Sequence, residues 1–518
     1  MDTNSLTYKT LKNVTYRFLS FTWPMIFSIL ITPIIVLKLG AKDYGIYIFI
    51  STVTSLLGLL DLGVSYAVVK YLAEYHAQAD TEKTKRLIYS ANSLFLLVGV
   101  AGFLATVGLY FGGAKLFASR LAGQQYLMIL FLLAGGGFLL NSLNQLYALV
   151  PDAIQRFDIS SKLNIVYLTL SSLGNLVLVL LGYRLISIFV FQLLLTFIFF
   201  FIRRYYAVAI LPIAKYRLNW NREEIKRCYR FGLATVINNT ASTSLAYLDR
   251  LIIPIFIGPA QLTYYSLPGN VAARIPGVTD NLSGIIFPVS AGMAGTGDKE
   301  RINRFYIRSV RLITLLASAI SLSVIFLSHQ ILQYWLNADF ANRSTGVLII
   351  LTLTNLTIAL LSPITAFFFG LGKLKFSTAL SLVMAMLNAL FLFVLLPRYG
   401  IMGAAWAYLL SVLPIFYMIY FIEQKYLKLP GRGRYHTRTI AQIGITALVF
   451  FFIVKFLITP IIFNFVTLAV GGPLAVIIFI ALFWLFGFLP NEDRNDMKRF
   501  LHLIGQRFSP PKKKEALH

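Results

Sequence analysis

Three charged side chains lie inside stretches that are otherwise apolar enough to cross a lipid bilayer. Asp249 and Arg250 are adjacent, and Arg274 follows in the next apolar stretch. A charge at the centre of a bilayer costs about 2.5–3.5 kcal/mol on insertion scales, so such a residue faces water, a partner or a ligand. The planar guanidinium of arginine matches the oxygens of phosphate groups. The two arginines therefore indicate a binding site for a negatively charged group.

Composition supports a membrane protein. The chain has 518 residues, of which 58% are hydrophobic, whereas soluble domains are about 45–50% apolar. The single cysteine, Cys228, excludes a disulfide framework and a cysteine-rich zinc site. The first apolar stretch is long enough to span and lacks a small-residue cleavage site, so we expect no cleaved signal peptide.

The apolar stretches predict an all-α integral membrane protein with about 14 transmembrane helices, each about 20 residues long. Basic residues concentrate in every second connection, and the opposite connections hold only Lys38, Lys42, Lys115, Arg120, Arg184, Arg343 and Arg398. By the positive-inside rule, both termini are expected to be cytoplasmic. The net charge of +26 is thus a topology signal with contact to anionic membrane lipids, and we expect no nucleic acid partner. The expected spans are 18–37, 44–69, 87–111, 121–146, 160–182, 185–202, 231–257, 264–292, 309–330, 346–369, 376–396, 400–422, 439–460 and 465–489.

A long basic connection divides six expected spans from eight. The two parts begin alike: Leu39-Gly40 precedes Tyr47 by the same spacing with which Ile257-Gly258 precedes Tyr265. This similarity favours two like bundles, as in transporters built from repeats. The expected divisions are an N-terminal lobe (1–202), a cytoplasmic basic connection (203–230), a C-terminal lobe (231–422), a cytoplasmic loop (423–438), two further spans (439–489) and a cytoplasmic basic tail (490–518).

Polar residues recur at helical spacing within several spans. Asn239 shares a helix face with Asp249, while Asn270, Arg274 and Asn281 align on the next span. Small and hydroxyl residues on such faces are also what helix packing uses. We expect Arg274, Arg250, Asn239, Asn270 and Asn281 to bind substrate.

Three carboxylates within spans are candidates for ion coupling: Asp61, Asp249 and Asp280. Each has an alternative interpretation. Asp61 could cap a helix or bridge the lobes, and Asp249 could form a structural pair with Arg250. Asp280 could be the counter-ion of Arg274 in the empty state.

Motifs for catalysis and nucleotide use are absent from the sequence. No GxxxxGK[ST] loop occurs, and no HExxH motif or clustered histidines indicate a metal site. The outer connections are short, with no room for a folded domain. We therefore expect no enzyme, no catalytic residues, no metal and no cofactor, with coupling to Na⁺, H⁺ or the membrane potential.

Three short motifs stand out along the chain. They are Leu39-Gly40-Ala41-Lys42-Asp43-Tyr44-Gly45-Ile46-Tyr47 with Leu60-Asp61-Leu62-Gly63, then Leu248-Asp249-Arg250-Leu251-Ile252-Ile253 with Gly258 and Tyr264-Tyr265, and Pro397-Arg398-Tyr399-Gly400-Ile401-Met402-Gly403-Ala404-Ala405. In their residues and their order, these motifs resemble the polysaccharide flippases of the O-antigen type, in the multidrug/oligosaccharidyl-lipid/polysaccharide exporter superfamily.

The resemblance implies two six-helix lobes around a central cavity that opens alternately to each side, plus two C-terminal helices. It implies a polyprenyl-pyrophosphate-linked oligosaccharide as cargo, a bacterial or archaeal plasma membrane, and polysaccharide polymerases and glycosyltransferases as partners. The lipid II flippases of the superfamily carry arginines in the first span, whereas residues 19–37 contain none here; this difference favours another glycan. A membrane glycan polymerase or ligase and a small-molecule exporter are the alternatives.

Overall fold

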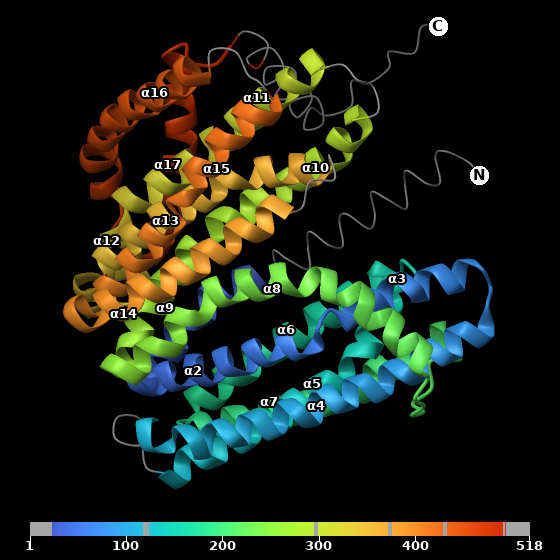
Figure 1. Ribbon diagram of the computed structural model, residues 1–518. Helices are drawn as coiled ribbons and strands as arrows, with labels where there is room; N and C mark the ends of the chain where they lie inside the picture. The colour runs from blue at the N-terminus through green and yellow to red at the C-terminus, as the bar shows by residue number, and fades with distance from the viewer. Residues whose placement is uncertain are drawn as a thin grey trace, which may run out of the picture. The chain divides into compact units, whose positions relative to one another are not determined.

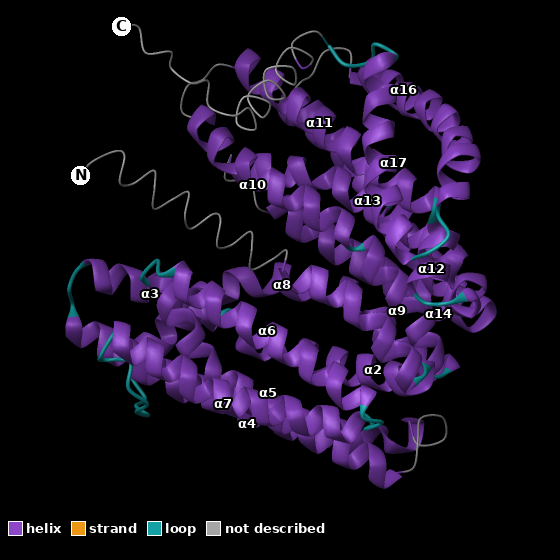
Figure 2. Ribbon diagram, turned by 180° about the vertical axis from the view of Figure 1, so that it is seen from behind, coloured by secondary structure: helices purple, strands orange, loops and turns teal. Residues whose placement is uncertain are grey.

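Helices make up the regular structure of the described part of this protein. The computed structural model describes residues 23–117, 124–294, 299–370, 375–427, 432–490 and 493, and within these ranges it contains no strand (Figures 1 and 2). Ten helices are long and apolar enough to cross a membrane, and a shorter apolar helix covers Trp23–Leu39. The all-α, multi-pass membrane fold is thus confirmed, while the number of 14 spans stays a prediction.

The labelled helices follow one another with short connections. Their bounds are α2 (Ala41–Leu57), α3 (Val64–Ala77), α4 (Thr81–Phe117), α5 (Gln124–Ala153), α6 (Phe157–Leu180), α7 (Leu185–Ile210), α8 (Arg222–Ile257), α9 (Pro259–Ala272), α10 (Arg274–Ala294), α11 (Lys299–Phe326), α12 (Ser328–Trp335), α13 (Ala338–Gly370), α14 (Lys375–Val412), α15 (Pro414–Ile422), α16 (Arg432–Ile453) and α17 (Phe465–Leu485). Short 3₁₀ or π turns cover Gly58–Asp61, Glu423–Leu427, Val454–Ile458 and Thr459–Ile461.

Several expected spans are broken into two helices, including the two that hold Asp61 and Arg274. The expected span 44–69 is α2 and α3, because Leu62 and Gly63 adopt left-handed backbone angles between them. The expected span 264–292 is α9 and α10, which meet at Ala273. The spans expected at 376–396 and 400–422 meet within α14 at Gly400, whose φ of 58° and ψ of −141° are not helical and mark a kink.

The chain forms two compact units. The first comprises residues 1–269 and 374–414, and the second comprises 270–373 and 415–518. In the first unit, α5 packs against α4 and α7, and α8 packs against α2, α3 and α14 (Figure 1). In the second unit, α10 and α11 pack against α13, and α17 packs against α11 and α16. The expected lobes, divided at 203–230, stay a prediction.

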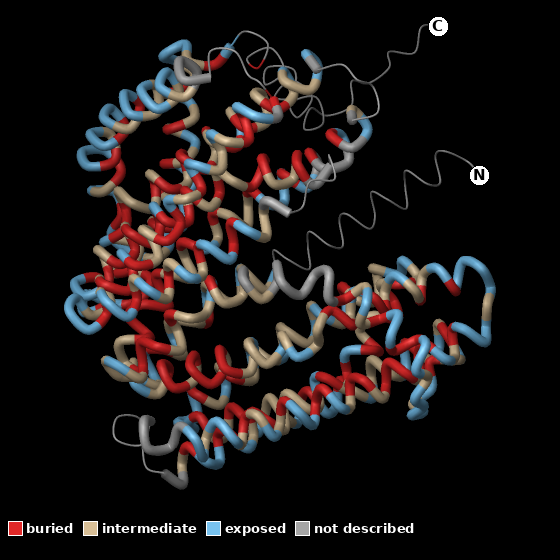
Figure 3. The backbone as a smooth tube through the Cα atoms, in the orientation of Figure 1, coloured by how far each residue is buried: buried red, intermediate tan, exposed pale blue. Residues whose placement is uncertain are grey.

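Large apolar side chains cover the outer surfaces of both units. Leu104 and Phe111 on α4 and Val466 on α17 are 61%, 65% and 70% exposed, as expected of side chains that contact acyl chains. Most described positions of α16 are exposed or half-buried, and Thr446 and Phe450 are the buried ones among them (Figure 3). Phe450 on α16 packs with Phe479 of α17 and with α11 side chains in one buried cluster. This cluster holds the C-terminal helix pair onto the second unit.

The two similar sequence segments share a backbone conformation. Gly40, before α2, has φ 82° and ψ 157°, and Gly258, before α9, has φ 95° and ψ 161°. This region of backbone space is essentially restricted to glycine. Each glycine therefore permits the same sharp reversal between two helices, which explains the matching Leu-Gly and Ile-Gly pairs in the sequence.

Candidate binding site in the membrane helices

Arg274 is the first residue of α10 and is half-buried. Its neighbour Ile275 is 1% exposed and packs with Ala317 of α11 and Ala359 of α13. This packing fixes the start of α10 within the second unit. Within the described part of the chain, the Arg274 side chain forms no ion pair and no hydrogen bond. The five N–H donors of its guanidinium are therefore available to an anionic ligand.

Polar side chains link α10 to α13 deeper in the second unit. Ser362 of α13 donates a hydrogen bond to Asp280 Oδ1 at 2.6 Å, and its Oγ lies 2.9 Å from Ser283 Oγ. Arg274 and Asp280 form no ion pair among the described residues. The expectation that Asp280 is the counter-ion of Arg274 is therefore not met, because its carboxylate instead bonds to a neighbouring helix.

Asn281 occupies the open face of α10. Its side chain is exposed, and its Nδ2 donates to the carbonyl oxygen of Gly277 at 2.7 Å. A Cβ added at Gly284 would meet no atom within 4 Å. The face that carries Asn281 and Gly284 is thus open, in contrast to the face that carries Ser283 and contacts α13.

Asp249 ties α8 to α9 within the first unit. Only 3% of Asp249 is exposed, and Tyr265 O–H donates a hydrogen bond to its Oδ2. The backbone N–H of Arg250 donates to Asp249 Oδ1 at 2.8 Å. The Arg250 guanidinium lies 5.6 Å from the centre of the Tyr247 ring, within the range of a cation–π contact. Asp249 thus stabilises the hairpin, and the adjacent Arg250 is held over an aromatic face.

Asp61 is the last residue of the 3₁₀ turn Gly58–Asp61, which precedes α3. Its Oδ2 accepts a hydrogen bond from the backbone N–H of Ser65 at 3.2 Å, so this oxygen caps the first turn. Its Oδ1 is buried and has no hydrogen-bond partner among the described residues. Gln145 of α5 reaches the same turn by donating to Ser65 Oγ at 3.2 Å. Asp61 therefore combines a capping bond with one carboxylate oxygen that could accept a proton or contact a cation.

For the remaining candidate residues, the structure gives a position in the fold but no side-chain contact that bears on ligand binding. Asn239 lies within α8, but its side chain is outside the described residues. Asn270 is half-buried in α9 and is the first residue of the second unit. Arg250 belongs to the first unit and Arg274 to the second. The expected convergence of both arginines on one ligand stays a prediction.

Sequence reasoning missed two of the polar partners. Ser283 follows Asp280 by three positions, a spacing that places both on neighbouring parts of one helix surface, and this could have indicated a shared contact. Tyr265 was noted only for its place in the repeat, although a tyrosine next to a buried carboxylate is a natural donor. Among the described residues, no group of three or more His, Cys, Asp or Glu could hold a metal ion.

Comparison with known proteins gives a family and a fold. The profile of a family described as polysaccharide biosynthesis protein matches residues 38–345. A Shigella flexneri protein named "Putative O-antigen transporter" is 22% identical over 418 residues, covering 78% of this chain and 95% of that protein. An uncharacterised membrane protein of Methanocaldococcus jannaschii is 21% identical, covering 77% of this chain and 80% of its own length.

Two solved structures share the fold at low sequence identity. The lipid II flippase MurJ, in an inward closed conformation, aligns with a TM-score of 0.71 and 15% identity, covering 92% of this chain and all of that one (100%). An inward-facing multidrug resistance transporter of the MATE family, from the same exporter superfamily, aligns with a TM-score of 0.62 and 14% identity, covering 79% and 98%. The exporter fold expected from the three sequence motifs is thereby confirmed.

Proposed function

Because the chain belongs to the polysaccharide biosynthesis protein family, we propose that it is a flippase for a polyprenyl-pyrophosphate-linked oligosaccharide. It moves this cargo from the cytoplasmic to the outer leaflet by alternating access and catalyses no reaction. The observation that carries the proposal is the half-buried guanidinium of Arg274, which has no ion pair among the described residues. The relative named as an O-antigen transporter and the fold shared with a lipid II flippase support it.

In this proposal the pyrophosphate is bound by arginine and the glycan by amides. Arg274 holds the pyrophosphate through paired N–H donors, with Arg250 as the second cation. Asn239, Asn270 and Asn281 contact sugar or phosphate oxygens, because an amide both donates and accepts hydrogen bonds. The open face of α10 around Asn281 supports this assignment.

We propose that an ion gradient or the membrane potential drives transport, without a cofactor. Two negative charges moving outward gain about 2.3 kcal/mol each per 100 mV of inside-negative potential, if they cross uncompensated. Asp61 and Asp280 are the stronger candidates for binding Na⁺ or H⁺. The unpartnered oxygen of Asp61 and the exposure of Asp280 favour them over Asp249, whose two oxygens both accept hydrogen bonds.

Purified protein in sealed vesicles tests the function. The vesicles contain labelled lipid-linked oligosaccharide, and a membrane-impermeant lectin or enzyme reports the label that reaches the other leaflet. We expect transfer that an imposed potential accelerates and that added ATP does not. Vesicles without protein are the control. A requirement for ATP hydrolysis would contradict the driving force, whereas glycan polymerisation, or export of a small dye without lipid transfer, would replace the flippase by one of the alternative functions.

The proposed location is a bacterial or archaeal plasma membrane with both termini cytoplasmic, close to polysaccharide polymerases and glycosyltransferases. Cysteine labelling tests the orientation, since the only native cysteine, Cys228, is buried. In intact cells, Arg343→Cys should react with an impermeant maleimide, because its connection is expected outside. Arg304→Cys should react only after permeabilisation. Both side chains are well exposed, at 56% and 75%. The reverse pattern of labelling would invert the topology.

A further inference from the structure

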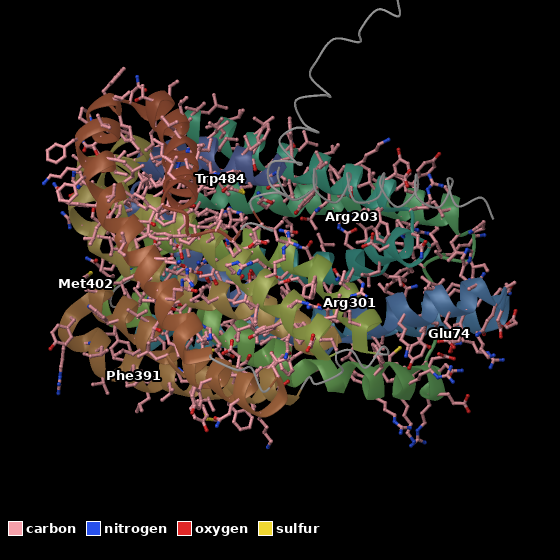
Figure 4. All side chains as sticks on the ribbon, turned by 90° about the horizontal axis from the view of Figure 1, so that it is seen from above. Glu74, Arg203, Arg301, Phe391, Met402 and Trp484 are labelled. Carbon is pink, nitrogen blue, oxygen red and sulfur yellow. The ribbon has the colours of Figure 1, made fainter. Side chains whose placement is uncertain are left out.

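A basic pocket lies on the first unit, and none of the candidate transport residues lines it. Its volume is about 690 Å³, and it forms where α3, the start of α4 and the first turns of α8 meet (Figure 1). Glu74, labelled in Figure 4, lies at this end of α3. The pocket has five cationic side chains against the carboxylates of Glu223 and Glu224, a surplus of three positive charges. The cations are Lys83, Arg86, Lys226, Arg227 and Arg230.

The backbone around the basic pocket is held in place by hydrogen bonds between α4 and the connection that precedes α8. Ser93 Oγ donates to the carbonyl oxygen of Asn219 at 3.0 Å, and the backbone N–H of Asn221 donates to Ser90 Oγ at 3.3 Å. Asn221 then caps α8 by accepting from two backbone N–H groups in its first turn. The cations of α4 and α8 are therefore presented by connected, packed backbone rather than by a loose loop.

A buried relay orients one of these cations. Arg227 Nη1 donates a hydrogen bond to the phenolic oxygen of Tyr75, and Tyr75 O–H donates to Glu224 Oε2 at 3.2 Å. Burial raises the pKa of Tyr75 above its ordinary value, so the phenol keeps its proton and remains a donor. Glu224 is 7% exposed, and its charge is directed toward this relay. The relay fixes Arg227, and Lys83 pairs with Asp80 at 2.9 Å. The three remaining cations are left to a ligand.

Three of the five cations of the basic pocket are available to a ligand. Arg86, Lys226 and Arg230 are exposed and, within the described residues, form no ion pair or hydrogen bond. Arg86 directly precedes the apolar part of α4, and Arg230 precedes the apolar span that opens at Phe231. Both guanidinium groups therefore lie at the boundary between the hydrocarbon and the water, the depth at which lipid phosphates lie.

Two aromatic side chains also line the basic pocket. They are those of Tyr71 and Phe231, and their rings are 6.0 Å apart in an edge-on arrangement. Lys70 Nζ lies 4.3 Å from the centre of the Phe231 ring. Cationic side chains next to apolar aromatic rings suit a ligand that carries phosphate at one end and apolar chains at the other.

We propose that the basic pocket binds the phosphate group of an anionic ligand, as a second site beyond the transport site. Two sources share this chemistry: the head group of an anionic phospholipid in the adjoining leaflet, and a soluble phosphate compound. Arginine and lysine donors around one cavity match phosphate oxygens. The positive-inside rule requires basic residues on this side of the membrane, but it does not require them to line one pocket.

Native mass spectrometry of the purified full chain in uncharged detergent tests this site. The probes are phosphatidic acid, phosphatidylcholine with the same acyl chains, and inorganic pyrophosphate. The double variant Arg86→Gln/Arg230→Gln is compared with Arg217→Gln/Arg222→Gln, which removes two exposed cations from the same region that do not line the pocket. The melting temperature of each variant reports on folding.

We expect the pocket variant to bind phosphatidic acid about thirtyfold more weakly, since each basic residue near an anionic surface contributes a roughly fivefold preference. The control variant should lose less than about threefold, and phosphatidylcholine binding should not change. If pyrophosphate displaces phosphatidic acid, the ligand is a soluble phosphate compound. If phosphatidic acid stays bound in the presence of pyrophosphate, the ligand is a lipid. The proposed site would be contradicted if both variants lost the same affinity for phosphatidic acid, or if the pocket variant lost less than threefold. Because binding is measured, the result does not depend on the proposed transport.

Discussion

Arg274→Ala should abolish transport of lipid-linked oligosaccharide while leaving protein levels near normal. Removal of one partner from a desolvated charge pair costs about 2–5 kcal/mol, which corresponds to a loss of at least about thirtyfold in cargo affinity. Folding should be preserved, because the Arg274 side chain has no hydrogen bond or ion pair among the described residues that its removal would break. Initial rates of transfer in vesicles give the size of the effect.

Two further substitutions sharpen this test. Arg274→Lys keeps the charge but lacks the planar fork of donors, so it should restore only part of the rate. Arg343→Ala removes an exposed arginine whose partner is Asp339 on the same helix, and it should transport normally. Full activity of Arg274→Ala would remove the basis of the proposed site, and full rescue by lysine would show that only charge matters.

Gly45→Ala should prevent stable folding of the first unit. A Cβ at Gly45 would lie 1.8 Å from the carbonyl oxygen of Pro259, the first residue of α9. The contact cannot relax through a side-chain rotation, because it is made with backbone, and Thr263 Oγ1 also binds α2 by donating to the Ala41 carbonyl oxygen at 2.7 Å. Forced overpacking usually costs about 1–3 kcal/mol, and we expect a cost at or above the upper end of that range.

Gly137→Ala is the matched control for this substitution. Gly137 lies within α5, and a Cβ there would meet no atom within 4 Å. Because alanine is favoured over glycine within helices by about 1 kcal/mol, Gly137→Ala should keep or raise the melting temperature. Comparison of the monodisperse yield and melting temperature of both variants in detergent measures the difference. A Gly45→Ala protein as stable as the wild type would contradict the close packing of α2 against α9.

The sequence predicted the fold class because the bilayer constrains sequence strongly. Apolar segments that are exposed to lipid and about as long as these must be helical, because a helix satisfies its own backbone hydrogen bonds. The helix breaks were less predictable, because hydropathy averages over them. The turn at Leu62-Gly63 and the junction at Ala273 interrupt stretches that were each expected to form a single span. Gly40 and Gly258 were found through their neighbours, and their shared backbone angles explain why the repeat carries glycine at both positions.

The candidate site was predictable in its residue types but not in its pairings. A charge within an apolar span is visible in any sequence, and Arg274 was found in this way. The partner of Asp280 lies 82 positions away on α13, and helix periodicity cannot say which two polar faces meet. The basic pocket was missed for a different reason: its lysines and arginines also obey the positive-inside rule, which explained them without a binding site.

A density map of the full chain with its lipid-linked oligosaccharide bound tests the central claim most directly. We expect the pyrophosphate to lie within hydrogen-bond distance of the Arg274 guanidinium, in a cavity that excludes acyl chains. Density for the pyrophosphate elsewhere, or an Arg274 side chain that points into lipid or is fully paired within a dry helix contact, would contradict it.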